Sequence, residues 1–212
     1  MKKIFVAGDV HDDYEALAAF MRYAQAKNAD EIWFDGDFSL RPYKATDLQN
    51  LFSQKQNGTI PRQAIINFIE AKRTNNSAVL RQMKTIFDES GVPYRVVPGN
   101  YDPEINEMFV EKDLHKKTKT CGEAKMFGYG GADAFPSHIK LLAQLGEIVN
   151  FDHHELYKQL KQNLPDVLLT HNPPFMFCDR MFNGQNVGTK ATTQYIQEHS
   201  PKLVVCGHIH ES

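Results

Sequence analysis

The sequence predicts an α/β fold in which helices cover a β-sheet. Five short apolar runs, rich in β-branched and aromatic residues, recur along the chain, and segments with helical periodicity lie between them. The chain has 212 residues, of which 42% are hydrophobic and 24% are charged. A chain of this size can bury about 70% of the surface that its unfolded form exposes. This composition excludes disordered, collagen-like and membrane-spanning classes.

The five apolar runs have the length of buried strands and are bounded by glycine, proline or polar residues. They are residues 4–7, 32–34, 94–97, 167–169 and 203–206. Parallel strands joined by helices would place the carboxyl ends of all five at one rim.

Five segments are expected to form the covering helices. An apolar stripe from Tyr14 to Ala24 follows the first strand, with Asp12 or Asp13 as its cap. A second helix is expected around 65–69, opened by Pro61, and a third around 80–87, ended by Gly91. Weaker patterns cover 153–163 and 190–199. We therefore expect one domain over 1–212, with a helical insertion at 38–93 that could overhang a site near Asp37.

Charge and cysteine content limit the partners. The formal net charge is −2, so no global positive field exists to hold nucleic acid, although a local basic groove stays open as an alternative. Three scattered cysteines form neither a disulfide framework nor a Cys-x-x-Cys pair. The apolar run at the N-terminus is too short for a signal peptide. We expect a cytoplasmic protein with no membrane segment, and its oligomeric state is left open.

Each predicted strand runs directly into residues that commonly bind metals. They are Asp9 and His11, Asp37, Asn100, His171, and His208 with His210. Residues two apart in an extended chain point to the same side, so each Asp-x-His or His-x-His pair can face one cavity. A mixture of imidazole nitrogens with carboxylate and amide oxygens favours manganese, iron, zinc or cobalt over magnesium or calcium. Seven ligands are too many for one tetrahedral ion, so two ions sharing a carboxylate fit better.

In this order, Asp-x-His, Gly-Asp, Gly-Asn-x-Asp, His and Gly-His-x-His resemble the calcineurin-like metallophosphoesterase superfamily, from residue 9 to 210. The resemblance implies a four-layer α-β-β-α sandwich. It also implies two metal sites that share Asp37. The first would use Asp9, His11, Asp37 and His210, and the second would use Asp37, Asn100, His171 and His208. Two divalent transition metals are expected, manganese first, with iron, zinc, nickel or cobalt as alternatives.

The function that follows is hydrolysis of a small phosphate ester, with phosphodiesters ahead of phosphomonoesters. A hydroxide bridging the two ions would attack phosphorus in line. Asn100, Tyr101 and Asp102 are the expected catalytic residues. Tyr101 stands where the superfamily commonly has a histidine that protonates the leaving group; its phenol could donate a proton but not relay one near neutrality. Asp102 would orient a neighbouring group.

Two other functions are weighed. A protein-interaction module that keeps the fold with weak catalysis is suggested by Tyr101 and by a sequence that ends soon after His210, where the superfamily usually continues into further strands. A nuclease would need a basic groove across the pocket. The lysines between 112 and 125 are instead expected to form a solvated face, and Gly128–Gly131 a hairpin or strand end. His115, His138 and His199 are expected on the surface or in loops.

Overall fold

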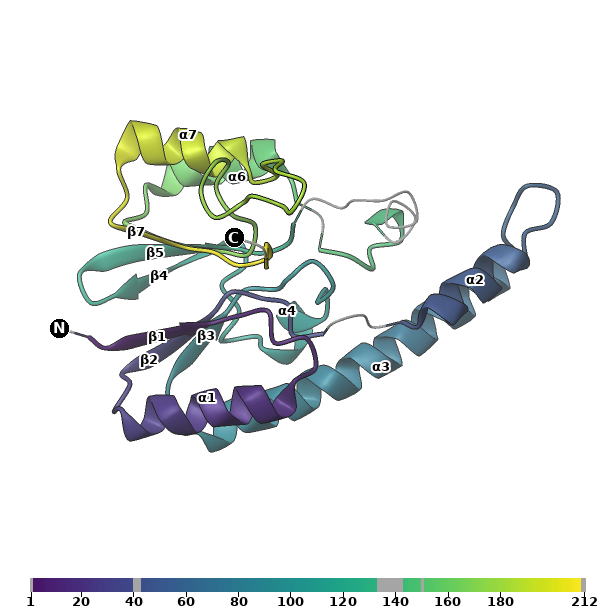
Figure 1. Cartoon of the computed structure of the whole chain (residues 1–212), viewed down its shortest axis with the longest axis horizontal. Coiled ribbons are helices and arrows are strands. Elements are labelled where there is room, and N and C mark those ends of the chain that lie inside the picture. The colour runs from purple at the N-terminus through teal and green to yellow at the C-terminus, as the bar shows by residue number, and fades with distance from the viewer. Residues whose placement is uncertain (1, 40–42, 133–142, 150, 211–212) are drawn as a thin grey trace.

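Two β-sheets stack face to face in the computed structural model, which describes residues 2–39, 43–132, 143–149 and 151–210 (Figure 1). The first sheet contains β1 (Ile4–Ala7), β2 (Glu31–Phe34) and β3 (Tyr94–Val96), all parallel, in that order. The second contains β4 (Lys117–Cys121), β5 (Ala124–Tyr129), β6 (Val167–Thr170) and β7 (Leu203–Val205), in that order. Of these described strands, only β4 runs antiparallel to its neighbour.

Helices cover the outer face of each sheet. Figure 1 shows α1 (Tyr14–Ala26) and α3 (Arg62–Glu89) below the first sheet, and α6 (His153–Asn163) and α7 (Lys190–His199) above the second. The short α4 (Ile105–Met108) follows β3, and α2 (Ala45–Ser53) precedes α3. The expected four-layer sandwich is confirmed.

Three apolar cores separate the four layers, because alternate strand residues face opposite sides. On β2, Ile32 and Phe34 pack against α1 and α3, whereas Trp33 faces the second sheet. On β6, Leu168 packs toward α6 and α7, whereas Val167 and Leu169 meet the first sheet. This alternation fixes the register of the described strands in both sheets.

The predicted strands and most predicted helices are confirmed, with two differences. The helices expected around 65–69 and 80–87 are one 28-residue helix, α3. No glycine or proline interrupts it, and the polar run between the two apolar stretches is buried in part by contacts with distant loops. The hairpin of β4 and β5 was missed as a pair of strands, although β5 does end within the predicted Gly128–Gly131 segment.

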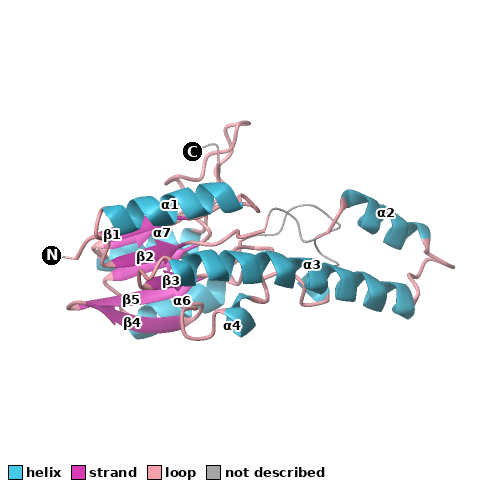
Figure 2. Cartoon of the chain, turned by 90° about the horizontal axis from the view of Figure 1, so that it is seen from below, coloured by secondary structure: helices cyan, strands magenta, loops and turns pink. Residues whose placement is uncertain are grey.

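An arm projects from one end of the sandwich (Figure 2). We define the arm as α2 together with residues 62–76 of α3. Its own small core contains Tyr43, Leu48, Leu51, Ala64, Phe68 and Ile148, with Tyr101 packed against it. The segment 38–93 thus supplies both a layer of the sandwich and this arm. Among the described residues, no helix combines the length and apolar character needed to cross a bilayer.

Candidate metal centre

The loops after the strands are tied to one another by backbone hydrogen bonds. Beyond the end of β1, Asp9 N donates to Gly36 O (2.9 Å) and His11 N donates to Asp37 O (3.2 Å). In the second sheet, Gly207 N donates to His171 O (3.1 Å). Side chains from distant parts of the sequence are therefore held at one rim of the sandwich.

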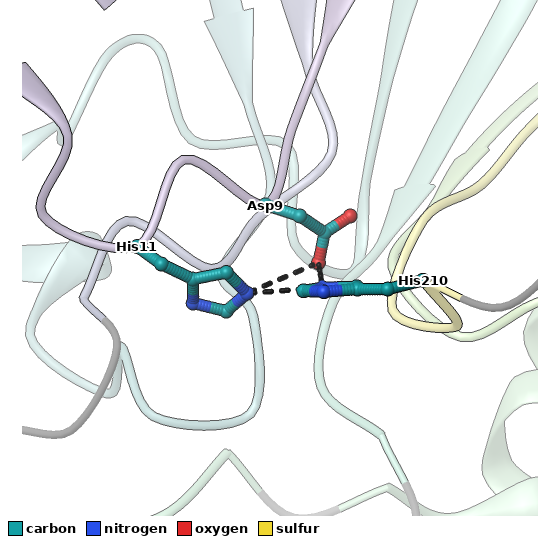
Figure 3. Close-up of side chains that lie close together, drawn as sticks. All are labelled: Asp9, His11 and His210. Atoms are coloured by element: carbon teal, nitrogen blue, oxygen red, sulfur yellow. Dashed lines mark hydrogen bonds and ion pairs between the residues drawn. The ribbon is translucent and has the colours of Figure 1, made fainter. Parts of the chain in front are cut away.

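A first cluster contains Asp9, His11 and His210, whose ligand atoms all lie within 4.8 Å of one another. Figure 3 shows the three side chains pointing toward one another. His11 Nε2 and His210 Nε2 are 3.0 Å apart, and Asp9 Oδ1 lies 3.9 Å from the first and 3.4 Å from the second. His210 lies on the solvent-facing side of the site, because 55% of its side chain is exposed.

A second cluster contains Asp37, His171 and His208, again within 4.8 Å. His171 is fully buried, and its Nδ1 lies 2.8 Å from the carbonyl oxygen of Asp35. That contact fixes the ring so that Nε2 faces the site, 3.4 Å from Asp37 Oδ1. His208 N donates to both oxygens of Asp9, at 3.2 and 3.0 Å, and so connects the two clusters.

Asp37 lies between the clusters, and each of its oxygens faces a different one. Oδ1 is 3.4 Å from His171 Nε2, and Oδ2 is 3.8 Å from His11 Nε2. The Asn100 amide faces both oxygens; with its nitrogen toward them it would donate at 3.1 and 3.2 Å, and with its oxygen toward them it adds another acceptor. Asn100 Oδ1 also lies 3.4 Å from His171 Nε2. Acceptor atoms that converge in this way fit a shared cation.

The backbone of the site is held in an uncommon conformation. Asp9, His11, Asp37 and His208 all have positive φ, between 47° and 73°. Such conformations are uncommon outside glycine and persist where the surrounding structure enforces them, often at functional sites. Four of the seven predicted ligands share this feature, which marks the rim independently of the side-chain distances.

The electrostatics of the site follow from its burial and its mixed charges. Burial opposes ionisation of Asp37, but the facing His171, His11 and His208 outweigh it and lower the pKa of that carboxyl. Burial also opposes protonation of His171, yet the nearby carboxylates, Asp37 foremost, raise its pKa to about 10. For His208, burial and the neighbouring His171 lower the pKa to about 4. Asp37 thus stays ionised, as a metal ligand must.

Sequence reasoning missed Asp35, which joins Asp9 and His171 in a third group of ligand atoms within 4.8 Å. Its side chain is almost fully buried, Oδ1 has no hydrogen-bond partner among the described residues, and burial raises its pKa to about 7. The i, i+2 alternation that pairs Asp9 with His11 applies equally to Asp35 and Asp37 and could have found it.

The three expected catalytic residues occupy different environments. Asn100 lies among the ligands. Asp102 is fully buried and accepts hydrogen bonds from the backbone N–H groups of Phe38 (3.0 Å), Ser39 (3.3 Å) and Gly99 (3.1 Å). Burial raises its pKa to about 7. The Tyr101 ring lies 6.3 Å from the Tyr43 ring, edge to face, against the core of the arm.

Of the histidines expected on the surface or in loops, His138 lies outside the described residues. His115 lies in the loop between α4 and β4, where it is partly buried, and its Nδ1 accepts a hydrogen bond from Gly130 N (2.9 Å). It packs on Tyr129 because β5 brings that ring beside it. It takes no part in either cluster.

The sequence matches the family model described as calcineurin-like phosphoesterase over residues 2–212. The chain belongs to this family. Among solved structures, one superposes with a TM-score of 0.72 at 17% identity, covering 100% of this chain and 85% of the other. The protein TT1561 of Thermus thermophilus gives a TM-score of 0.59 at 19% identity, covering 96% of this chain and 80% of the other. These likenesses show the fold alone. No curated protein matches the sequence.

Membership of the calcineurin-like phosphoesterase family implies metal-dependent hydrolysis of phosphoric esters. The possible metal-ligand groups at the rim agree with that activity.

Proposed function

We propose that this calcineurin-like phosphoesterase is a phosphodiesterase with a dinuclear centre. The single observation that carries the proposal is Asp37, whose two oxygens face His171 on one side and His11 on the other. A carboxylate with a different imidazole against each oxygen fits a bridging ligand. The proposed first site contains Asp9, His11, Asp37 and His210, and the proposed second contains Asp37, Asn100, His171 and His208.

When bound there, two divalent transition metals, with manganese as the first candidate, would supply Lewis-acid activation of the phosphate and of a water. The chain's own groups hold the two clusters together and orient the ligand side chains. The ionised Asp37 draws the two clusters together, and Asp35 keeps the Nε2 of His171 turned inward through its carbonyl oxygen. Asn100 offers its amide beside the Asp37 carboxylate.

Proton donation to the leaving group distinguishes this chain from superfamily members with histidine at position 101. The Tyr101 ring packs against the arm, 6.3 Å from Tyr43. We propose that substrates with good leaving groups are favoured, because such groups depart without a proton. Rates should therefore fall steeply from nitrophenyl to alkyl esters.

The test is a metal-dependent assay on the purified chain. Bis(p-nitrophenyl) phosphate and p-nitrophenyl phosphate are supplied with Mn²⁺, Fe²⁺, Zn²⁺, Ni²⁺ or Co²⁺ in turn. Asp37→Asn and His171→Gln should abolish turnover, whereas His154→Gln, at an exposed position of α6, should not. Metal-independent activity, or full activity in the first two variants, would reject the proposal. Metal binding without turnover of any ester would instead support the interaction-module alternative.

The cellular setting is also a proposal. Cys121, Cys178 and Cys206 are all free thiols. Unpaired cysteines are typical of reducing compartments, which supports a cytoplasmic enzyme acting on a small phosphate ester.

A further inference from the structure

The arm helix α3 buries polar residues on the stripe that faces the rest of the molecule. Its buried positions follow helical spacing from end to end; they are Ala64, Phe68, Lys72, Asn76, Leu80, Met83 and Phe87. Five of these are apolar, but Lys72 and Asn76, in the middle, are 1% and 0% exposed. Burying a polar side chain is costly unless its hydrogen bonds are made, so these two residues must have partners.

The partners of Asn76 lie on the two loops that carry the central ligands. Its side-chain oxygen accepts a hydrogen bond from Ser39 Oγ, two residues after Asp37. Its Nδ2 donates to the backbone oxygen of Tyr101 (3.2 Å), the residue after Asn100, and to the Glu104 carboxylate. One amide therefore spans the loop after β2 and the loop after β3.

A second layer of contacts holds these partners. Lys72 Nζ lies 3.1 Å from Glu147 Oε2 and 3.5 Å from Glu104 Oε1. The arm helix therefore contacts both oxygens of Glu104, one through Lys72 and the other through Asn76. Ser39 itself has its carbonyl oxygen 3.5 Å from His11 Nδ1. The contacts of Asn76 thus reach residues beside Asp37, Asn100 and His11.

We propose that Asn76 is a positioning residue of the metal centre, whose amide sets the spacing between the loop that carries Asp37 and the loop that carries Asn100. This inference rests on the proposed function, because it concerns the same centre. Asn76 touches no ligand side chain. It acts through Ser39 and Tyr101, and it makes the arm part of the site's framework.

The test compares metal affinity across variants of the full chain by calorimetric titration with Mn²⁺, alongside thermal unfolding. Asn76→Ala should weaken Mn²⁺ binding by about 10- to 100-fold, as expected when a group that orients ligands is removed. Asn75→Ala is the matched control, since it removes the same side chain from an exposed position of the same helix. Ser39→Ala deletes one hydroxyl of the same network and should weaken binding in the same direction, which provides the answer if Asn76→Ala does not fold.

Leu80→Ala tests whether a loss of stability alone would weaken metal binding, because Leu80 lies one turn further along α3 in the apolar core. That variant should unfold at a lower temperature yet keep the wild-type Mn²⁺ affinity. Wild-type affinity in a folded Asn76→Ala, or in Ser39→Ala if the first does not fold, would overturn this inference alone. Equal weakening in Leu80→Ala would also overturn it. Failure of the wild-type chain to bind any of Mn²⁺, Fe²⁺, Zn²⁺, Ni²⁺ or Co²⁺ would overturn the proposed function as well.

Discussion

Substitution of Gly99 by alanine should disrupt the metal centre through backbone spacing alone. Gly99 precedes Asn100 and packs directly on the loop that carries Asp37. A Cβ at this position would lie 2.7 Å from Asp37 Cα and closer still to the Asp37 amide nitrogen. Glycine is required here for close approach of two backbones.

The size of the effect follows from ordinary contact distances. Non-bonded carbon atoms rest at about 3.5–4.0 Å, so the two loops must separate by about 1 Å to admit the methyl group. A displacement of about 1 Å can lower catalysis by about 100-fold. We expect a comparable loss in kcat/KM, weaker Mn²⁺ binding, and a cost of about 1–3 kcal/mol in the free energy of unfolding from overpacking.

The assay is Mn²⁺-dependent hydrolysis of bis(p-nitrophenyl) phosphate, with Mn²⁺ titration and urea unfolding on the same preparations. Gly91→Ala is the control, because Gly91 has a φ of +66° with open space around its Cβ. It should lose stability through backbone strain of about 1–2 kcal/mol and keep its activity. A folded Gly99→Ala with wild-type kcat/KM and Mn²⁺ affinity would refute the argument that close loop packing holds the ligands in place.

Three further predictions concern metal, charge and pH. Free Mn²⁺ at 100 times its dissociation constant should raise the free energy of unfolding by about 2.7 kcal/mol per site, and Asp37→Asn should remove most of that gain in urea unfolding. Lys72→Met removes the cation that the buried Glu104 and Glu147 share and should cost about 3–5 kcal/mol, whereas Lys84→Met, which breaks an exposed pair with Asp88 on the same helix, should cost under about 1 kcal/mol; equal costs in chemical unfolding would contradict this. Burial lowers the pKa of His115 to about 4, so the unfolded chain takes up the proton more readily and stability falls as pH drops below about 6.5. The decrease in the free energy of unfolding between pH 7.5 and pH 5 should be about 2 kcal/mol smaller in His115→Asn, whose side-chain oxygen can still accept a hydrogen bond from Gly130 N. An unchanged decrease would contradict the lowered pKa of His115.

Strand positions and the order of the candidate ligands could be predicted because their signals are local. A run such as Ile4–Ala7 is short, apolar and followed by a candidate ligand, and similar runs precede candidate ligands at 32–34, 94–97, 167–169 and 203–206. Parallel pairing then brings the strand ends together without further information. That rule holds within each sheet, whereas Asp9 follows β1 of the first sheet and His210 follows β7 of the second. Their convergence depends on the face-to-face stacking of the two sheets, which the family resemblance implied and the strand signals did not.

Other features depend on burial that the sequence does not reveal. Asp35 looks like an ordinary turn residue until Gly8 and Gly207 are seen to leave room for its side chain between two loops. Tyr101 looks like a substitute proton donor until its ring is found against the arm. In both cases a distant segment determines the environment, and no local pattern identifies that segment.

The merged helix α3 shows why polar residues on an apolar stripe carry information. The apolar residues around 65–69 and 80–87 predict two helices, and the polar run from Lys72 to Ser77 lies between them. The spacing from Phe68 through Lys72 and Asn76 to Leu80 nevertheless stays at four residues, so a continuous helix buries all four on one side. Two polar side chains can be buried on that stripe only if the surface opposite is polar as well. On this chain the surface opposite consists of Glu104, Glu147 and the loops beside the ligands, so the polar interruption marks where the helix passes the proposed metal centre.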